Sequence, residues 1–210
     1  MCICKVLRPN TMDAAIDEEA KLDVYNISKY CKNGNLIIDV GANIGAFAVF
    51  AKSLFPESRI ICIEPMADNF EVLKKNAGDF ACLEYGAISN TNRKLTMYHF
   101  GSEASACHSI YSGDVKGSTP VQVNGISFES LVNKYKIEKV NFLKMDCQGA
   151  EFIIIPSISR SILKKIDYIA LEIHNKIASN KKILFKVIEY ADKFKELSRR
   201  NSYQDKRFKI

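Results

Sequence analysis

Short apolar runs recur along the chain, and segments with helical spacing separate them. Continuous runs rich in Ile, Leu and Val are typical of strands that are buried on both faces. They predict strands at Leu36–Val40, Arg59–Glu64, Ala81–Ile88, Val140–Met145 and Tyr168–Ile173. Helical spacing predicts helices at Asp13–Lys32, Ala46–Phe55, Asp68–Asn76, Phe128–Tyr135, Phe152–Leu163 and Ile183–Ala191. Strands that alternate with helices predict a parallel sheet covered on both faces, and therefore an α/β fold.

Two regions depart from this alternation. Leu95–Phe100 is predicted as an excursion strand that pairs with Val121–Val123, and the Gly- and Ser-rich residues between them as a loop. At the end of the chain, Phe194–Arg199 and Arg207–Ile210 predict a closing hairpin, with a continuous helix to Arg200 as the alternative. Asp68 followed by Glu71 resembles a capping box at a helix start.

The length of 210 residues favours one domain. We divide it into a helical lead-in (1–34), a core (35–174) and a basic segment of helix and hairpin (175–210). Charge is uneven: residues 160–210 hold 14 Lys and Arg against 6 Asp and Glu, within a net charge of +6. This basic end suits an anionic partner such as nucleic acid, a phosphorylated substrate or a membrane surface, but we favour the simpler explanation of a solvated lysine-rich helix face.

Cysteine usage and hydropathy indicate in which compartment the protein is expected. The 7 cysteines are scattered without paired metal-ligand spacing, which favours buried thiols in a reducing compartment. Residues 36–55 approach the length of a membrane span, but Asp39, Asn43 and Lys52 interrupt them. With no signal-peptide pattern at the start of the chain, we expect a cytoplasmic protein without a membrane span and without a metal centre.

The chemistry is concentrated after the first two predicted strands. Asp39, Gly41, Asn43 and Gly45 form the pattern D-x-G-x-N-x-G, which lacks the lysine of a phosphate loop and the glycine spacing of a dinucleotide loop. An acidic residue here would repel a pyrophosphate but suits S-adenosylmethionine, whose amino-acid end is cationic. Glu64 ends the second strand, where a carboxylate accepts hydrogen bonds from ribose hydroxyls.

With these motifs the chain resembles the FkbM family of S-adenosylmethionine-dependent methyltransferases. The matching segments are IIDVGANIGAFAVFAK, RIICIEPMADNFEVLKKN, VNFLKMDCQGAEFIII and IALEIH. The resemblance implies a class I methyltransferase fold, a Rossmann-like three-layer sandwich whose seven-stranded sheet is mostly parallel with an antiparallel last strand. It also implies methyl transfer, most often to a hydroxyl oxygen of a small molecule or a sugar.

The resemblance also implies roles for single residues. Asp39, Gly41, Asn43 and Gly45 would line the methionine end of the cofactor, Glu64 would hold the ribose, Ala87 would face the adenine and Asp146 would lie beside the reactive centre. One position departs from the family pattern D-x-E-G-x-E, because Gln148 stands where the family usually has Glu. If the family's Glu takes part in catalysis, Gln148 would lower or abolish methyl transfer by this chain.

Asp146 is the first choice for a general base, and His174 and Glu151 are further catalytic candidates. Glu172 lies at the same edge, whereas His99 and His108 fall in the excursion and carry little weight. The main prediction is an O-methyltransferase acting on a small-molecule or glycan acceptor. The alternatives are an RNA methyltransferase that uses the basic segment, a cofactor-binding relative without catalysis, and a nicotinamide-dependent oxidoreductase. The sequence specifies neither the acceptor nor the oligomeric state.

Overall fold

The computed structural model describes residues 3–32, 35–101, 108–110, 117–172, 195–199 and 206–209. Its centre is a five-stranded sheet in the order β3-β2-β1-β7-β8, and every pairing within it is parallel. The strands are β1 (Leu36–Val40), β2 (Arg59–Glu64), β3 (Ala81–Tyr85), β7 (Phe142–Met145) and β8 (Ile169–Leu171). The order reverses direction at β1, where the chain crosses from β3 over to β7.

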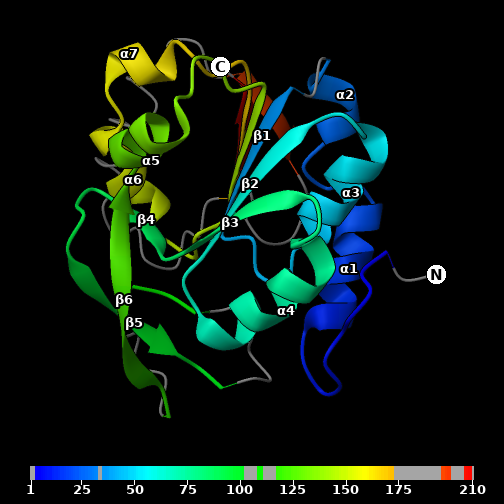
Figure 1. The fold of residues 1–210 in the computed structure, drawn as a ribbon, viewed down its shortest axis with the longest axis vertical. Coiled ribbons are helices and arrows are strands. Elements are labelled where there is room, and N and C mark those ends of the chain that lie inside the picture. Colours follow the sequence, from blue (N-terminus) through cyan, green and yellow to red (C-terminus); the bar gives the residue numbers. More distant parts are fainter. Residues whose placement is uncertain are drawn as a thin grey trace.

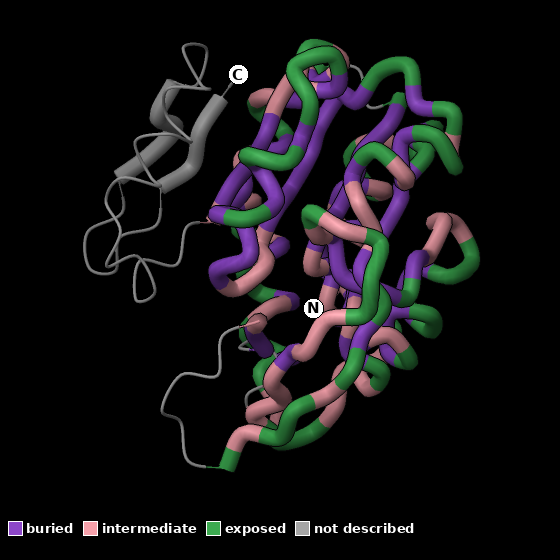
Figure 2. Tube along the Cα trace, turned by 90° about the vertical axis from the view of Figure 1, so that its left-hand side faces the viewer, coloured by how far each residue is buried: buried purple, intermediate pink, exposed green. Residues whose placement is uncertain are grey.

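Helices cover both faces of this sheet, as Figure 1 shows. One layer holds α1 (Asp13–Lys21), α2 (Ile27–Tyr30), α3 (Ala46–Leu54) and α4 (Ala67–Ala77), and the other holds α5 (Phe128–Tyr135), α6 (Glu151–Ser157) and α7 (Arg160–Leu163). Strand residues alternate between two apolar cores, so that Ile38 and Leu143 pack under α5 and α6 while Ile37 and Phe142 pack under α3. Buried residues accordingly follow the strands and the inner helix faces in Figure 2. The predicted three-layer α/β fold is confirmed.

The closing hairpin is also confirmed, and the alternative of a continuous helix is wrong. β9 (Lys195–Arg199) and β10 (Lys206–Lys209) pair antiparallel, and β10 lies next to β8. In the described part of the chain, the predicted seven-stranded sheet is instead a five-stranded parallel sheet and a separate antiparallel pair. The predicted helix at Ile183–Ala191 lies outside the described residues.

Three predicted elements are each interrupted in the structure. The helix predicted for 13–32 splits into α1 and α2 because Asp23 and Asn26 adopt left-handed backbone angles. The strand predicted for 81–88 stops before Gly86, where a Cβ atom would lie 2.8 Å from the Asn124 carbonyl oxygen. The helix predicted for 152–163 splits into α6 and α7, and Ser159 caps the second piece by accepting the Ile162 N–H.

The capping box predicted at Asp68 is wrong. Helix α4 already begins at Ala67, so Asp68 lies in its first turn and accepts the N–H of the adjacent Asn69. Glu71 pairs with Lys74 one turn later instead of reaching back to the helix start. Asp68 is thus available for contacts beyond its own helix.

The excursion forms a small second sheet beyond β3. β4 (Ala87–Ser89) pairs with β6 (Thr119–Ser127), and β6 pairs antiparallel with β5 (Lys94–His99). The predicted pairing of the excursion is confirmed, with Leu95 opposite Val123 and Met97 opposite Val121. Of the predicted loop, residues 108–110 are described, and Ser109 forms a β-bridge with Tyr98.

Candidate active site

The loop after β1 makes the closest backbone approach at this edge of the sheet. Gly41, Asn43 and Gly45 all have positive φ angles, at 73°, 50° and 87°. A Cβ atom on Gly41 would lie 2.0 Å from the carbonyl oxygen of Asp146, so only glycine fits there. The loop after β1 therefore lies against the turn after β7, which joins two of the segments that the sequence singled out.

Glu64 connects the same loop to the end of β2. Its Oε2 accepts the Asn43 N–H at 2.9 Å and its Oε1 accepts the Met66 N–H at 3.0 Å. The side chain is buried, and burial raises the pKa of this carboxyl to about 7 even though these hydrogen bonds act in the opposite direction. The Asn69 side chain also hydrogen-bonds this carboxylate. Because each carboxylate oxygen can accept more than one hydrogen bond, Glu64 is a buried acceptor that still has capacity for a ligand.

Asp39 is also buried, but it faces a cation of the protein itself. Nζ of Lys144, its register partner on β7, lies 3.0 Å from Oδ1 of Asp39 and donates to the Gly41 carbonyl oxygen at 2.7 Å. Burial raises the pKa of Asp39, and the Lys144 charge opposes that shift. The sequence analysis missed this pair, although a lysine inside the apolar run VNFLKM was the signal for it.

Asp146 lies at the centre of a polar cluster built from three segments. The Tyr25 hydroxyl lies 3.1 Å from Oδ2 of Asp146 and 3.1 Å from Oε2 of Glu172. The Gln148 side-chain amide donates to Oδ1 of Asp146 at 3.2 Å. Asp146 and Glu172 thus come together as the sequence predicted. Tyr25, which belongs to the lead-in, was missed because no local pattern marks it.

The other two catalytic candidates are Glu151, which the structure describes, and His174, which it does not. Glu151 is buried and closes the turn after β7, because its carboxylate accepts the Cys147 N–H at 2.6 Å and the Gly149 N–H at 2.8 Å. This is a positioning role for the turn that carries Asp146, and a direct role in catalysis stays a prediction. His174 lies outside the described residues.

Ala87 lies at the predicted edge of the sheet, in an apolar cluster with Met66, Met97 and Val123. Met66 follows Glu64 closely along the chain, and Met97 and Val123 come from the excursion. The excursion therefore packs over the ends of β2 and β3, where the resemblance places the adenine. That placement of the adenine stays a prediction.

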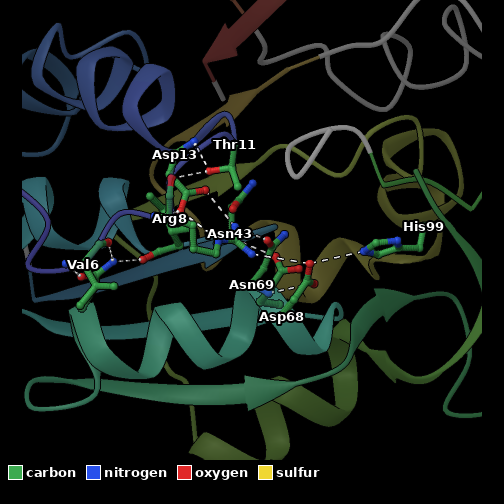
Figure 3. Close-up of polar contacts among 11 residues, drawn as sticks. Val6, Arg8, Thr11, Asp13, Asn43, Asp68, Asn69 and His99 are labelled. Carbon is green, nitrogen blue, oxygen red and sulfur yellow. Dashed lines mark hydrogen bonds and ion pairs between the residues drawn. The ribbon is translucent and has the colours of Figure 1, made fainter. Parts of the chain in front are cut away.

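Arg8 of the lead-in contacts side chains at the carboxyl ends of the parallel strands. Its guanidinium contacts both carboxylate oxygens of Asp13 and donates to Asn69 Oδ1 at 2.8 Å. A longer contact of 3.6 Å joins Arg8 to Asp68, which also lies 3.4 Å from His99 of β5. Figure 3 shows these side chains in a row from Arg8 through Asn69 and Asp68 to His99.

A parallel sheet that reverses its strand order at β1, with a glycine loop after β1 and a buried acid at the end of β2, has the architecture of the class I methyltransferases. A structure of a putative rRNA methylase from Clostridium thermocellum supports this fold, with a TM-score of 0.52 at 11% identity over 97% of this chain and 94% of that one. The chain belongs to the FkbM methyltransferase family, because the model described as "Methyltransferase FkbM domain" matches residues 39–203.

The chain is also similar to two curated proteins, of which the first carries a methyltransferase name. The hexuronic acid methyltransferase AglP of Haloferax volcanii is 24% identical over 81% of this chain and 68% of its own length. The AMB antimetabolite synthetase AmbE of Pseudomonas aeruginosa is 22% identical over 67% of this chain, but the match spans only 8% of AmbE. Among the described residues, no helix has the length and apolar character needed to cross a membrane.

Proposed function

We propose that this protein transfers the methyl group of S-adenosylmethionine to a hydroxyl oxygen of a small molecule or a sugar. The observation that carries the proposal is Glu64, a buried carboxylate at the end of β2 that is tied to the glycine loop by the Asn43 N–H. Among the described residues no cation is bonded to this acid, and such a buried acceptor suits a ligand that donates hydrogen bonds, such as a ribose. Family membership supplies the reaction class.

The residues present fit such a cofactor. Glu64 would accept the ribose hydroxyls, Gly41, Asn43 and Gly45 would bring loop backbone to the methionine end, and Ala87 would lie near the adenine. Because Lys144 neutralises Asp39, Asp39 would act on the methionine end mainly by fixing the loop through Lys144 and the Gly41 carbonyl. When bound, S-adenosylmethionine supplies an electrophilic methyl group on a sulfonium.

Asp146 is the group that would receive the acceptor proton. Gln148 and Tyr25 hold its two oxygens, which fixes the carboxylate at the edge of the sheet next to the glycine loop. Alignment of an acceptor with the methyl group can supply up to about 7–11 kcal/mol, and a positioned base typically adds 10²–10⁴-fold. The name of AglP, a hexuronic acid methyltransferase, makes sugar acids the first acceptors to try.

The test begins with binding. Calorimetric titration of the folded protein with S-adenosylmethionine and with S-adenosylhomocysteine is expected to show binding of both, and titration with NAD is expected to show none. Glu64→Ala is expected to abolish binding, whereas Glu57→Ala, on the exposed surface before β2, serves as the matched control. Absence of binding by the folded wild-type protein would overturn the proposal.

Turnover is then measured with labelled S-adenosylmethionine and a panel of hydroxylated acceptors that includes hexuronic acids. Asp146→Asn is expected to lower turnover by about 10²-fold or more with cofactor affinity retained. Transfer to RNA instead, with affinity that falls steeply as salt rises, would favour the RNA methyltransferase reading of the basic segment. Most of that segment lies outside the described residues.

A further inference from the structure

Asp68, His99 and His108 form a cluster that the catalytic proposal does not use. One ligand atom from each residue lies within 4.8 Å of the other two, and the two imidazole rings stack at a centroid distance of 4.4 Å. Nε2 of His108 is buried and has no hydrogen-bond partner among the residues that the structure describes. A buried N–H group without an acceptor is costly, which points to a ligand that supplies one.

The backbone determines which ring nitrogens carry the protons. Nδ1 of His108 accepts the Phe100 N–H at 3.2 Å, and Nδ1 of His99 accepts the Gly101 N–H at 3.1 Å. In a neutral ring the proton is then on Nε2. Burial, together with the nearby His99, lowers the pKa of His108 to about 4, so its ring is neutral at pH 7. The cluster therefore presents two N–H donors beside one carboxylate.

This arrangement does not suit a metal ion. A histidine that binds a metal through Nε2 normally donates its Nδ1–H to an acceptor, whereas both Nδ1 atoms here face backbone N–H groups. The rings are also nearly parallel, with an interplanar angle of 15°, so their Nε2 lone pairs would not converge on one ion. The donor set fits an organic ligand that offers both a hydrogen-bond donor and an acceptor.

Asp68 has acceptor capacity for such a ligand. Its Oδ1 accepts the Asn69 N–H at 3.0 Å, and its Oδ2 has a long hydrogen bond with Nε2 of His99 at 3.4 Å and a 3.6 Å ion pair with Arg8. Each carboxylate oxygen can accept a further hydrogen bond. Burial alone would raise the pKa of Asp68, yet hydrogen bonds, above all with His99, hold it below its usual value. The carboxylate is therefore ionised at neutral pH.

The position of the cluster identifies the ligand. Asp68 lies four residues after Glu64 in the sequence, in the first turn of α4. His99 lies on the same face of β5 as Met97, which packs on Met66 and Ala87. A flat ring held by these apolar side chains would present its edge to Asp68 and the two histidines. Met66, Ala87 and Met97 are at most 8% exposed, so a ring can enter between them only if these side chains are displaced.

We infer that Asp68 and the histidines His99 and His108 read the edge of the cofactor's adenine. Asp68 accepts a hydrogen bond from the 6-amino group, and a histidine Nε2–H donates to the adjacent ring nitrogen, which matches the donor and acceptor pattern of adenine. This inference rests on the proposed function, because it assigns further residues to the same cofactor site.

The test compares S-adenosylhomocysteine with S-inosylhomocysteine, in which an oxo group replaces the 6-amino group. Calorimetric titration of the wild-type protein is expected to show about 10- to 100-fold weaker binding of the inosine analogue, because its oxygen faces the Asp68 carboxylate. In Asp68→Asn, whose amide can either accept or donate, this preference is expected to fall below about threefold. Asp79→Asn, on the exposed surface, is the matched control and is expected to retain it.

The outcomes separate the two proposals. If the wild-type protein binds neither analogue, the proposed function fails. If it binds both equally, or if Asp68→Asn retains the full preference, the function stands and the adenine assignment is overturned. Stoichiometric Co²⁺ binding with ligand-field absorption that His108→Gln abolishes would also overturn it, because the cluster would then be a metal centre.

Discussion

Asp39 and Glu64 are buried carboxylates on the same face of neighbouring strands, but they differ in what compensates their charge. Asp39 has the Lys144 ammonium at 3.0 Å, whereas Glu64 is hydrogen-bonded by the backbone N–H groups of Asn43 and Met66 and by the Asn69 side chain. The charge of Asp39 is thus neutralised by a cation of the protein, whereas Glu64 has only neutral hydrogen-bond donors and keeps acceptor capacity for a ligand. An acidic residue in a sequence motif therefore does not have to bind a ligand, because the side chains packed around it determine whether its charge is already neutralised.

The largest expected effect comes from removing the cation beside Asp39. Lys144→Met leaves a buried carboxylate without its partner and is expected to cost about 3–5 kcal/mol of unfolding free energy. The double variant Asp39→Asn/Lys144→Met is expected to recover part of this loss, because it removes both charges. Urea denaturation measures both values. A loss below about 1 kcal/mol for Lys144→Met would mean that the ion pair is not what stabilises Asp39.

The second effect concerns the loop between the two acids. Gly41→Ala is expected to cost about 2–4 kcal/mol, because its φ of 73° disfavours a side chain and the new Cβ would meet the Asp146 carbonyl. Gly101→Ala is the matched control. Its φ is 84°, but none of the described residues lies within 4 Å of the new Cβ, so we expect a loss of only about 1 kcal/mol. Equal losses in the two variants would show that the close approach to Asp146 contributes nothing.

The third effect isolates the uncompensated charge of Glu64. Its pKa is about 7 in the folded protein, against an ordinary value of 4.5, so the folded state binds the proton more tightly than the unfolded chain. Its contribution to stability is present below pH 4.5 and is lost as pH rises to 7, by about 3 kcal/mol. Glu64→Gln is expected to remove this loss, which denaturation at pH 5 and pH 8 measures. His108 contributes in the opposite sense between pH 6.5 and 4, so the variant must be compared with the wild-type protein at each pH.

The sequence predicted the parts of this site that depend on local spacing. The loop from Asp39 to Gly45 and the acid at Glu64 follow from strand ends and glycine positions, which are local properties of the chain. Tyr25, in contrast, meets Asp146 across 121 residues. No local pattern reports that contact, because it depends on how the lead-in packs on the finished sheet.

The same dependence on tertiary contacts explains why some predicted elements differ from the observed helices and strands. Left-handed angles at Asp23 and Asn26 split a helix whose apolar spacing looked continuous. Gly86 ends a strand because its neighbours in space, Asn124 and Ile126, leave no room for a Cβ atom. The role of Asp68 was missed because its partners come from the excursion and from the lead-in. Each of these features depends on tertiary contacts between distant segments.

The smallest expected effect tests a third carboxylate, Asp146, which is only partly buried and accepts a hydrogen bond from the Gln148 amide. Gln148→Glu removes the donor to Oδ1 and adds a negative charge beside it. Because the pair is partly solvated, we expect a loss of at most about 1 kcal/mol above pH 6, or about 2–4 °C in Tm. Gln148→Met, which removes the donor without adding a charge, separates the two causes. A loss of equal size in Gln148→Met would show that the amide contact and not like-charge repulsion determines the effect, and that the glutamate usual in the family would sit beside Asp146 at no electrostatic cost.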